Sequence, residues 1–202
     1  MGSSADSASS APSPLAIEVV ALATGLGVRI AVAESLTGGL LAASIVAVPG
    51  ASLAISGGIV AYDTNLKASL LGVDRALLRE RGPVDAEVAR SMARGVRAAC
   101  AIPEGDAHVG VSTTGVAGPD PDPQTGQPAG TVWIGVSSAR GERAVRLELV
   151  PPGDDTRSGT RPEVRSEIRS EIRDAAVRRA LELLAEELRA LAETCGRSPE
   201  PS

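Results

Sequence analysis

A glutamate, a serine and a threonine lie within one short glycine-containing turn, Ala33-Glu34-Ser35-Leu36-Thr37-Gly38-Gly39. Residues 28–33 before it resemble a β-strand, and the residues after it favour a helix. Open α/β sheets bind ligands at the carboxyl ends of strands, and the first N–H groups of a helix bind anions. The turn therefore predicts a substrate site with Glu34, Ser35 and Thr37, in which Gly38 and Gly39 allow close approach. The alternative is that Ser35 or Thr37 only caps the helix.

The chain has one lysine, Lys67, among its twenty basic residues. Arginine stays protonated in proteins, whereas a lysine removed from water can become a neutral base. Because this chain uses arginine at every other basic position, the retained lysine suggests that a titratable amine is needed there. The alternative is that Lys67 survives by chance.

Composition argues against several other kinds of site. His108 is the only histidine, which excludes a multi-histidine metal site, and Cys100 and Cys195 lack a metal or redox spacing. The formal charge of −5, without aromatic residues among the basic ones, argues against nucleic-acid binding. There is no membrane-spanning apolar run and no secretory signal. We expect a cytoplasmic protein with reduced thiols and neither metal nor cofactor.

Apolar periodicity, proline and glycine divide the chain into alternating helices and strands. Helices are expected at about 14–26, 37–47, 64–71, 74–81, 86–100 and 162–194. Strands are expected at 28–33, 54–62, 107–113, 131–138 and 142–150, the last two as a hairpin. This order predicts a three-layer α/β/α sandwich with a mixed sheet and an antiparallel hairpin at one edge. The single domain is expected to span residues 13–194, between disordered tails at 1–12 and 195–202.

A second glycine-rich turn, residues 114–119, follows the strand expected at 107–113 and opens a loop that reaches residue 130. Loops of this length are more often functional than structural filler. If the two strands that precede the glycine-rich turns are parallel neighbours, both turns lie at one edge of the sheet. Thr114 and Gly115 are then expected to line the wall opposite Ser35.

The last helix begins with a tandem repeat, Arg165-Ser166-Glu167-Ile168 followed by Arg169-Ser170-Glu171-Ile172. With Arg161 and Arg173, the repeat forms a column of arginines four residues apart, with glutamates alongside. Such a column is typical of a solvated, ion-paired helix face. The alternative is that its first arginine or two reach a substrate phosphate.

Four segments together resemble the CinA C-terminal family, also called PncC, in order and spacing through most of residues 14–185. The segments are Ala33–Gly39, Gly57–Tyr62 with Lys67 five residues on, Thr114–Pro119 and Pro128–Trp133. Similar members are nicotinamide-nucleotide amidohydrolases, which convert nicotinamide mononucleotide to nicotinate mononucleotide and ammonia in pyridine nucleotide recycling. The resemblance is to the stand-alone form, since the chain has no room for the N-terminal pyrophosphatase domain of longer members.

Hydrolysis of a carboxamide needs a nucleophile, a base, donors for the oxyanion and an acid for the departing ammonia. Ser35 is the candidate nucleophile and Lys67 its base, since Ser-Lys arrangements occur in other hydrolases. Tyr62 is a candidate proton relay, or else a core aromatic residue at a strand end. The N–H groups of residues 37–39 are expected to form either an oxyanion hole or a phosphate cradle. Glu34 is expected to pair with Lys67 or with the pyridinium ring, unless its role is structural.

Two features depart from the family pattern. Thr64 stands where the family usually has asparagine, and the tandem repeat resembles an insertion. Two other functions stay open: a non-catalytic nucleotide-binding module linked to competence or DNA damage, and a hydrolase of a different amide. The expected partners are a small-molecule nucleotide substrate and a second copy of the chain in a homodimer.

Overall fold

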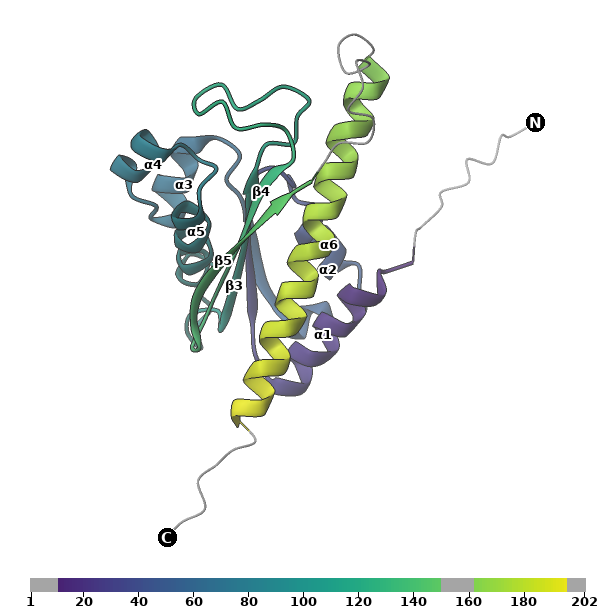
Figure 1. The fold of residues 1–202 in the computed structure, drawn as a ribbon. Coiled ribbons are helices and arrows are strands. Elements are labelled where there is room, and N and C mark those ends of the chain that lie inside the picture. The colour runs from purple at the N-terminus through teal and green to yellow at the C-terminus, as the bar shows by residue number, and fades with distance from the viewer. Residues whose placement is uncertain (1–10, 150–161, 196–202) are drawn as a thin grey trace, which may run out of the picture.

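The computed structural model describes residues 11–149 and 162–195 (Figure 1). Its helices are α1 (Pro14–Leu26), α2 (Leu40–Val46), the 3-10 turn η1 (Ala51–Leu53), α3 (Thr64–Leu71), α4 (Arg75–Arg81), α5 (Ala86–Ala99) and α6 (Pro162–Cys195). Its strands are β1 (Ile30–Glu34), β2 (Ile55–Val60), β3 (Val109–Gly115), β4 (Thr131–Ser138) and β5 (Gly141–Glu148). The predicted tails, apart from residues 11, 12 and 195, lie outside the described residues, as do residues 150–161.

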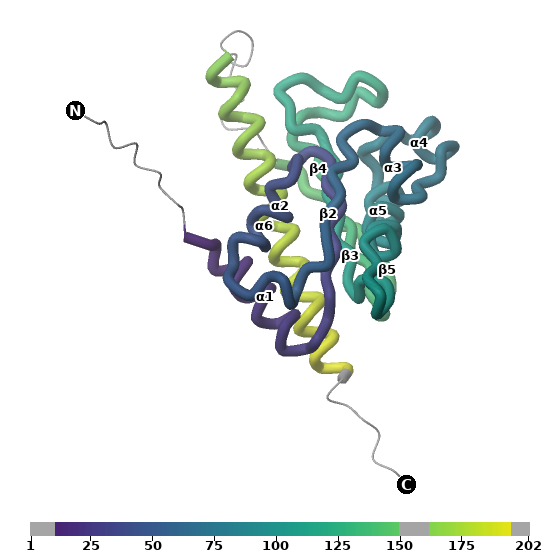
Figure 2. Tube along the Cα trace, turned by 180° about the vertical axis from the view of Figure 1, so that it is seen from behind, coloured from purple at the N-terminus to yellow at the C-terminus, as the bar shows by residue number. Residues whose placement is uncertain are grey.

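The strands form one sheet in the order β2-β1-β3-β4-β5. β1 pairs in parallel with β2 and with β3, whereas β4 is antiparallel to both β3 and β5. The predicted mixed sheet with an antiparallel hairpin at one edge is therefore confirmed. β5 comes forward in Figure 1, and β2, the opposite edge, comes forward in the reverse view of Figure 2.

Helices cover both faces of the sheet, with α1, α2 and α6 on one side and α3, α4 and α5 on the other (Figures 1 and 2). The central strand β1 is buried on both faces. Ile30 and Val32 belong to the apolar core under α1, α2 and α6. Ala31 and Ala33 belong to the second core, under α3, α4 and α5. A strand buried on both faces is typical of a parallel sheet between two helix layers.

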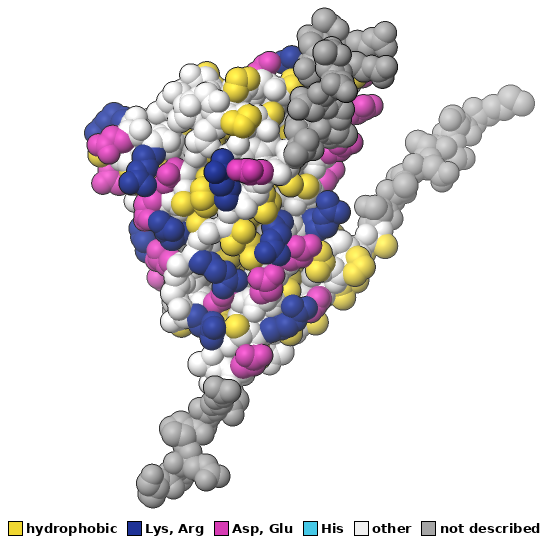
Figure 3. Space-filling model, in the orientation of Figure 1, with side chains coloured by type: hydrophobic (Ala, Val, Ile, Leu, Met, Phe, Trp, Pro, Cys, Tyr) yellow, Lys and Arg dark blue, Asp and Glu magenta, His cyan; other side chains and the backbone are white. Residues whose placement is uncertain are grey.

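The β5 side of the molecule is covered with basic and acidic side chains in mixed order (Figure 3). On the strand itself these include Glu142, Arg143, Arg146 and Glu148. Charged residues on an edge strand discourage pairing with another sheet. None of the described helices is long and apolar enough to cross a membrane.

Two local features differ from the prediction. The helix predicted at 37–47 begins at Leu40, because residues 35–39 form a turn in which Gly38 and Gly39 take positive φ angles of 58° and 99°. The 3-10 turn η1 was not predicted. It follows Gly50, which also has a positive φ, and it leads directly into β2.

Candidate active site

The three parallel strands end at one edge of the sheet and bring three separate segments together. Ser35 follows β1, Tyr62 lies just after β2, and Thr114 and Gly115 end β3. They line one cleft of about 470 Å³. Its other described lining residues are Leu36, Thr64, Lys67, Pro83, Val84, Val116, Ala117, Gly118, Asp120, Pro121, Asp122, Pro123 and Arg169.

Ser35 and Lys67 are in direct contact at the base of this cleft. The Lys67 Nζ atom donates to Ser35 Oγ at 3.0 Å and to the Ala61 carbonyl oxygen at 2.8 Å. Lys67 is 1% exposed and Ser35 9% exposed. Lys67 reaches Ser35 because α3 begins only a few residues after β2, so that the helix lies beside the end of the sheet.

Burial leaves a larger fraction of Lys67 in the neutral form near pH 7 than is usual for a lysine. Desolvation lowers the pKa of Lys67 from 10.5 to about 8, and the nearby Asp63 carboxylate opposes part of this change. Asp63 also caps α3, since its side chain accepts from the Asn65 N–H group. A neutral amine is therefore accessible near neutral pH, at hydrogen-bond distance from a serine hydroxyl.

Glu34 has a structural position and does not contact Lys67. Its carboxylate accepts the N–H groups of Gly39 and Leu41 with one oxygen, at 3.0 and 3.1 Å, and that of Ala42 with the other, at 2.8 Å. These are first-turn donors of α2, where a carboxylate compensates the helix dipole. Glu34 is 1% exposed and is not among the cleft-lining residues. Of the alternatives predicted for Glu34, its contacts match the structural one, and it makes no pair with Lys67.

The N–H groups of Gly38 and Gly39 already have hydrogen-bond acceptors within the protein. Gly38 donates to the Ser35 carbonyl oxygen at 3.1 Å, and Gly39 donates to Glu34. Neither group forms the oxyanion hole or phosphate cradle predicted for residues 37–39. Among the described residues, the N–H groups of Leu36 and Thr37 have no acceptor. Leu36 and Thr37 directly follow Ser35. In other hydrolases the N–H group of the residue after the nucleophile is one of the oxyanion donors.

Thr37 anchors the turn to β3 and α6. Its hydroxyl shares a 2.7 Å hydrogen bond with Thr113, and both side chains are fully buried. Its carbonyl oxygen accepts from Arg173 Nη2 at 2.9 Å, and Ser35 N–H donates to the Thr113 carbonyl oxygen. Thr37 is therefore placed to hold the turn by its side chain and to offer its N–H group.

Tyr62 lies at the mouth of the cleft rather than between the two reactive groups. Its side chain is 61% exposed, and its hydroxyl accepts from Arg169 Nη2 at 3.3 Å. Because Ser35 and Lys67 touch directly, proton transfer between them needs no relay. The structure brings Tyr62 to the same cleft but gives no contact between its hydroxyl and either residue.

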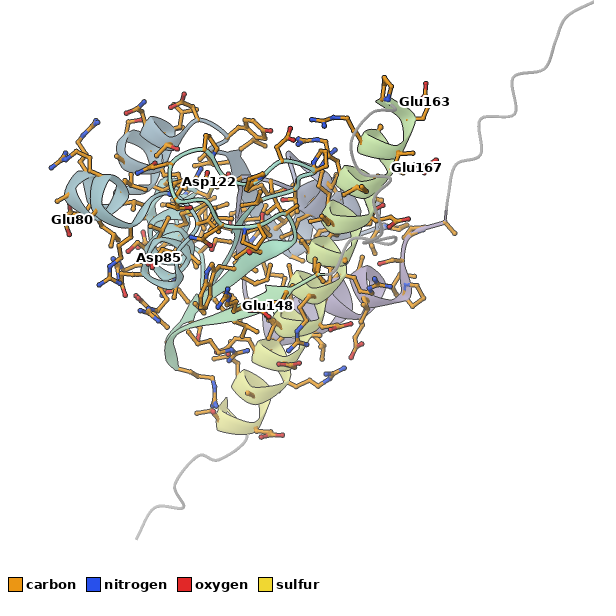
Figure 4. All side chains as sticks on the ribbon, turned by 45° about the horizontal axis from the view of Figure 1, so that its top comes forward. Glu80, Asp85, Asp122, Glu148, Glu163 and Glu167 are labelled. Carbon is orange, nitrogen blue, oxygen red and sulfur yellow. The ribbon has the colours of Figure 1, made fainter. Side chains whose placement is uncertain are left out.

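Thr114 and Gly115 line the same cleft as Ser35 and lead into the loop to Gly130. Thr114 Oγ1 donates to the Pro83 carbonyl oxygen at 2.7 Å, which joins this part of the cleft to the segment between α4 and α5. Seen from the edge where the parallel strands end, the loop with Asp122 lies between Glu80 on α4 and Glu163 and Glu167 on α6 (Figure 4).

The arginines of the repeated column make different contacts. Arg165 pairs with Asp120 of the loop, and Arg173 holds the Thr37 carbonyl. Arg169 lines the cleft, with Nη1 donating to the Gly118 carbonyl oxygen at 2.8 Å. Arg161 lies outside the described residues. Among the described arginines, Arg169 alone lines the cleft. The four-residue spacing of the column did not indicate which arginine would do so.

The comparisons with known proteins agree with this architecture. The model of the CinA C-terminal domain matches residues 13–188. A CinA-like protein of Frankia casuarinae is 47% identical over 144 residues, which cover 70% of this chain and 31% of that protein. The chain thus spans between 24% and 34% of the length of curated relatives that it matches.

Solved structures share the fold over most of the chain. A competence/damage inducible protein from Agrobacterium tumefaciens is 30% identical, with a TM-score of 0.70, covering 87% of this chain and 93% of that one. A CinA superfamily protein from Klebsiella pneumoniae is 26% identical, with a TM-score of 0.73, covering 87% and 96%. The chain belongs to the CinA C-terminal domain family.

Proposed function

We propose that this protein is an amidohydrolase that deamidates nicotinamide mononucleotide, with Ser35 as nucleophile and Lys67 as its base. The observation that carries the proposal is the 3.0 Å contact between Ser35 Oγ and a buried Lys67 whose pKa is lowered to about 8. A serine beside a buried amine is an arrangement that hydrolases use for acyl transfer. The choice of substrate rests on the family resemblance of the four sequence segments.

In this mechanism, neutral Lys67 takes the hydroxyl proton as Ser35 Oγ attacks the carboxamide carbon. The Ala61 carbonyl oxygen holds the Lys67 amine in place. The tetrahedral oxyanion accepts from the N–H groups of Leu36 and Thr37, which have no acceptor among the described residues. The Lys67 ammonium then donates its proton to the leaving nitrogen. Ammonia departs, and the acyl group remains on Ser35 as an ester. Water, deprotonated by Lys67, then attacks this ester; the carboxylate product leaves and the Lys67 ammonium returns the proton to Ser35 Oγ.

The nucleotide phosphate is proposed to bind at Arg169. The carboxamide must lie at the buried end of the cleft beside Ser35, so the ribose and phosphate extend toward the mouth, where Arg169 and Tyr62 lie. Arg169 is held by Gly118 and Tyr62 through Nη1 and Nη2. A guanidinium fixed in this way suits recognition of a phosphate. Arg165 is already paired with Asp120.

Ammonia release from nicotinamide mononucleotide, its riboside, nicotinamide and simple amides tests this proposal. We expect release from the mononucleotide without added metal and with a chelator present, and much weaker release from the riboside and nicotinamide. Ser35→Ala should abolish it, whereas Ser44→Ala, which removes a hydroxyl bonded only to Leu40 on α2, should not.

No ammonia from the mononucleotide at millimolar concentration would refute the enzymatic function. Tight binding of the mononucleotide without turnover would favour a non-catalytic binding module. Faster turnover of another amide would assign a different substrate to the same serine and lysine.

A further inference from the structure

Two apolar rows of the sheet continue into polar side chains beside the nucleophile turn. On the face that α1, α2 and α6 cover, β1 presents Val32 and β3 presents Val111, and these two residues are paired across the sheet. Because side chains alternate along a strand, the next residues on this face are Glu34 and Thr113, which are also paired. Both are buried. Two neighbouring strands thus carry a polar side chain in an apolar row at the level where the turn begins.

Thr113 has a hydroxyl group where packing alone would favour valine. Valine has nearly the same branched shape and would extend the apolar row, whereas a hydroxyl in a core costs free energy unless it is hydrogen-bonded. Among the described residues, the Thr113 hydroxyl has one partner, Thr37 Oγ1 at 2.7 Å. The hydroxyl of Thr113 is therefore explained by its contact with the turn and not by the packing of the core.

Thr113 holds the turn at two points. Its carbonyl oxygen accepts the Ser35 N–H group at 2.9 Å, which continues the pairing of β1 with β3 one residue beyond Glu34. Its side chain holds Thr37, two residues farther along. Leu36, whose N–H group is the other proposed oxyanion donor, lies between these two contacts. One residue of β3 therefore fixes the segment that carries the proposed nucleophile and both proposed donors.

We propose that Thr113 is a positioning residue that sets the place of the Ser35 hydroxyl relative to the oxyanion donors of the turn. This inference rests on the proposed function, because it takes Ser35 as the nucleophile and the N–H groups of Leu36 and Thr37 as the donors. Thr113 is not among the residues that line the cleft, so it acts through the turn and does not touch the substrate. Oxyanion stabilisation requires donors held within about 0.5 Å of the productive geometry, so Thr113 governs kcat and not KM.

Steady-state kinetics of Thr113→Val with nicotinamide mononucleotide test this inference. We expect kcat to fall about tenfold or more, while KM stays within about twofold of the wild-type value. Thr113→Ser keeps a hydroxyl group and should keep kcat within about threefold. The control is Ser112→Ala, which removes another fully buried hydroxyl from the same strand, one that donates to the Ala89 carbonyl oxygen on α5. This control should leave kcat within about twofold of wild type.

A double variant separates positioning from stability. Thr113→Val alone leaves the buried Thr37 hydroxyl without its partner, so the melting temperature should fall. Thr37→Val combined with Thr113→Val removes both hydroxyls, and the melting temperature should recover, because two apolar groups of the same shape then meet. The kcat of the double variant should stay low, since the side-chain contact between the turn and β3 is still missing. Recovery of kcat together with the melting temperature would show that Thr113 serves stability alone and would overturn the inference.

Hydrogen exchange tests the same inference without any substrate. The amides of Ser35 and Gly38, which donate to the carbonyl oxygens of Thr113 and Ser35, should exchange faster in Thr113→Val than in the wild type and stay unchanged in Ser112→Ala. Wild-type kcat in Thr113→Val, or an equal loss of kcat in Ser112→Ala, would overturn the inference, and so would unchanged exchange. If the wild-type protein releases no ammonia, the proposed function fails, and the exchange rates alone decide whether Thr113 holds the turn.

Discussion

The two glycine-rich segments at the cleft are built in different ways. The turn after β1 is held mainly by local hydrogen bonds: Glu34 accepts three N–H groups of residues 39–42, and Gly38 donates to Ser35. Thr113 of β3 and Arg173 of α6 add contacts from farther along the chain. The loop after β3 is fixed by contacts with segments far from it in the sequence. Its own Gln127 and Gln124 side chains donate to backbone carbonyl oxygens just before α5 and in α4, while α6 supplies the side chains of Arg165 and Arg169.

This difference separates two properties of the site. A turn held by local hydrogen bonds places the nucleophile and its oxyanion donors with little freedom, which favours transition-state stabilisation. A loop held by contacts with both helix layers sets the shape of the cleft and therefore which substrate fits. Changes at the first segment should alter kcat, and changes at the anchors of the second should alter KM.

Lys67→Arg should have the largest effect. Arginine keeps the charge but stays protonated, so kcat should fall by about 10²-fold or more, the scale of general-base catalysis. Lys67→Ala should be little worse. If Lys67 acted only by attracting the phosphate, the arginine variant would keep kcat within a few-fold and mainly change KM. Steady-state kinetics with the mononucleotide distinguish the two outcomes.

The pH dependence of the wild-type enzyme should follow the same group. Below the Lys67 pKa of about 8 the amine is charged, so kcat/KM should rise about tenfold per pH unit and level off above that value. Lys67 binds fewer protons folded than unfolded between pH 8 and 10.5, so its contribution to the free energy of unfolding rises over that range. A flat profile from pH 6 to 9 would contradict the base role.

Replacing Glu34 should damage both stability and turnover. Glu34→Gln keeps the size but loses the charge, and its amide group cannot accept all three N–H bonds. We expect a loss of about 2–3 kcal/mol in the free energy of unfolding and a lower kcat at little-changed KM. Ser13→Ala, which removes a single cap bond on α1, should cost about 1 kcal/mol and leave kcat intact. Equal effects of the two variants would contradict the special role of Glu34.

Arg169→Ala should change selectivity more than chemistry. Removal of a phosphate contact should raise KM for the mononucleotide by about tenfold or more and leave the riboside nearly unaffected. Arg165→Ala is the matched control, because Arg165 occupies the same position in the preceding repeat but pairs with Asp120. An equal loss on both substrates would assign Arg169 to loop anchoring instead, while leaving the amidase proposal intact.

The sequence by itself determined the order of elements and the fold class. Proline at the start of α1, aspartates before α4 and α5, and glycines after several helices are local signals, because caps and turns depend on neighbouring residues. Ser35 and Lys67 were also identified in this way, one by its turn and the other by being the single lysine. These predictions required no knowledge of which strands pair.

Tertiary structure alone decided what each polar group contacts. From the sequence, Glu34 could be either a substrate ligand or a helix cap. The position of α2 in the fold decides between them, because three N–H groups at its start donate to the Glu34 carboxylate. The arginines of the repeated column are equivalent in sequence, and only the position of the loop after β3 against α6 brings Arg169 to the cleft. Hydrogen-bond partners that are far apart in the sequence cannot be predicted from local periodicity, because the packing of the helix layers against the sheet determines which residues meet.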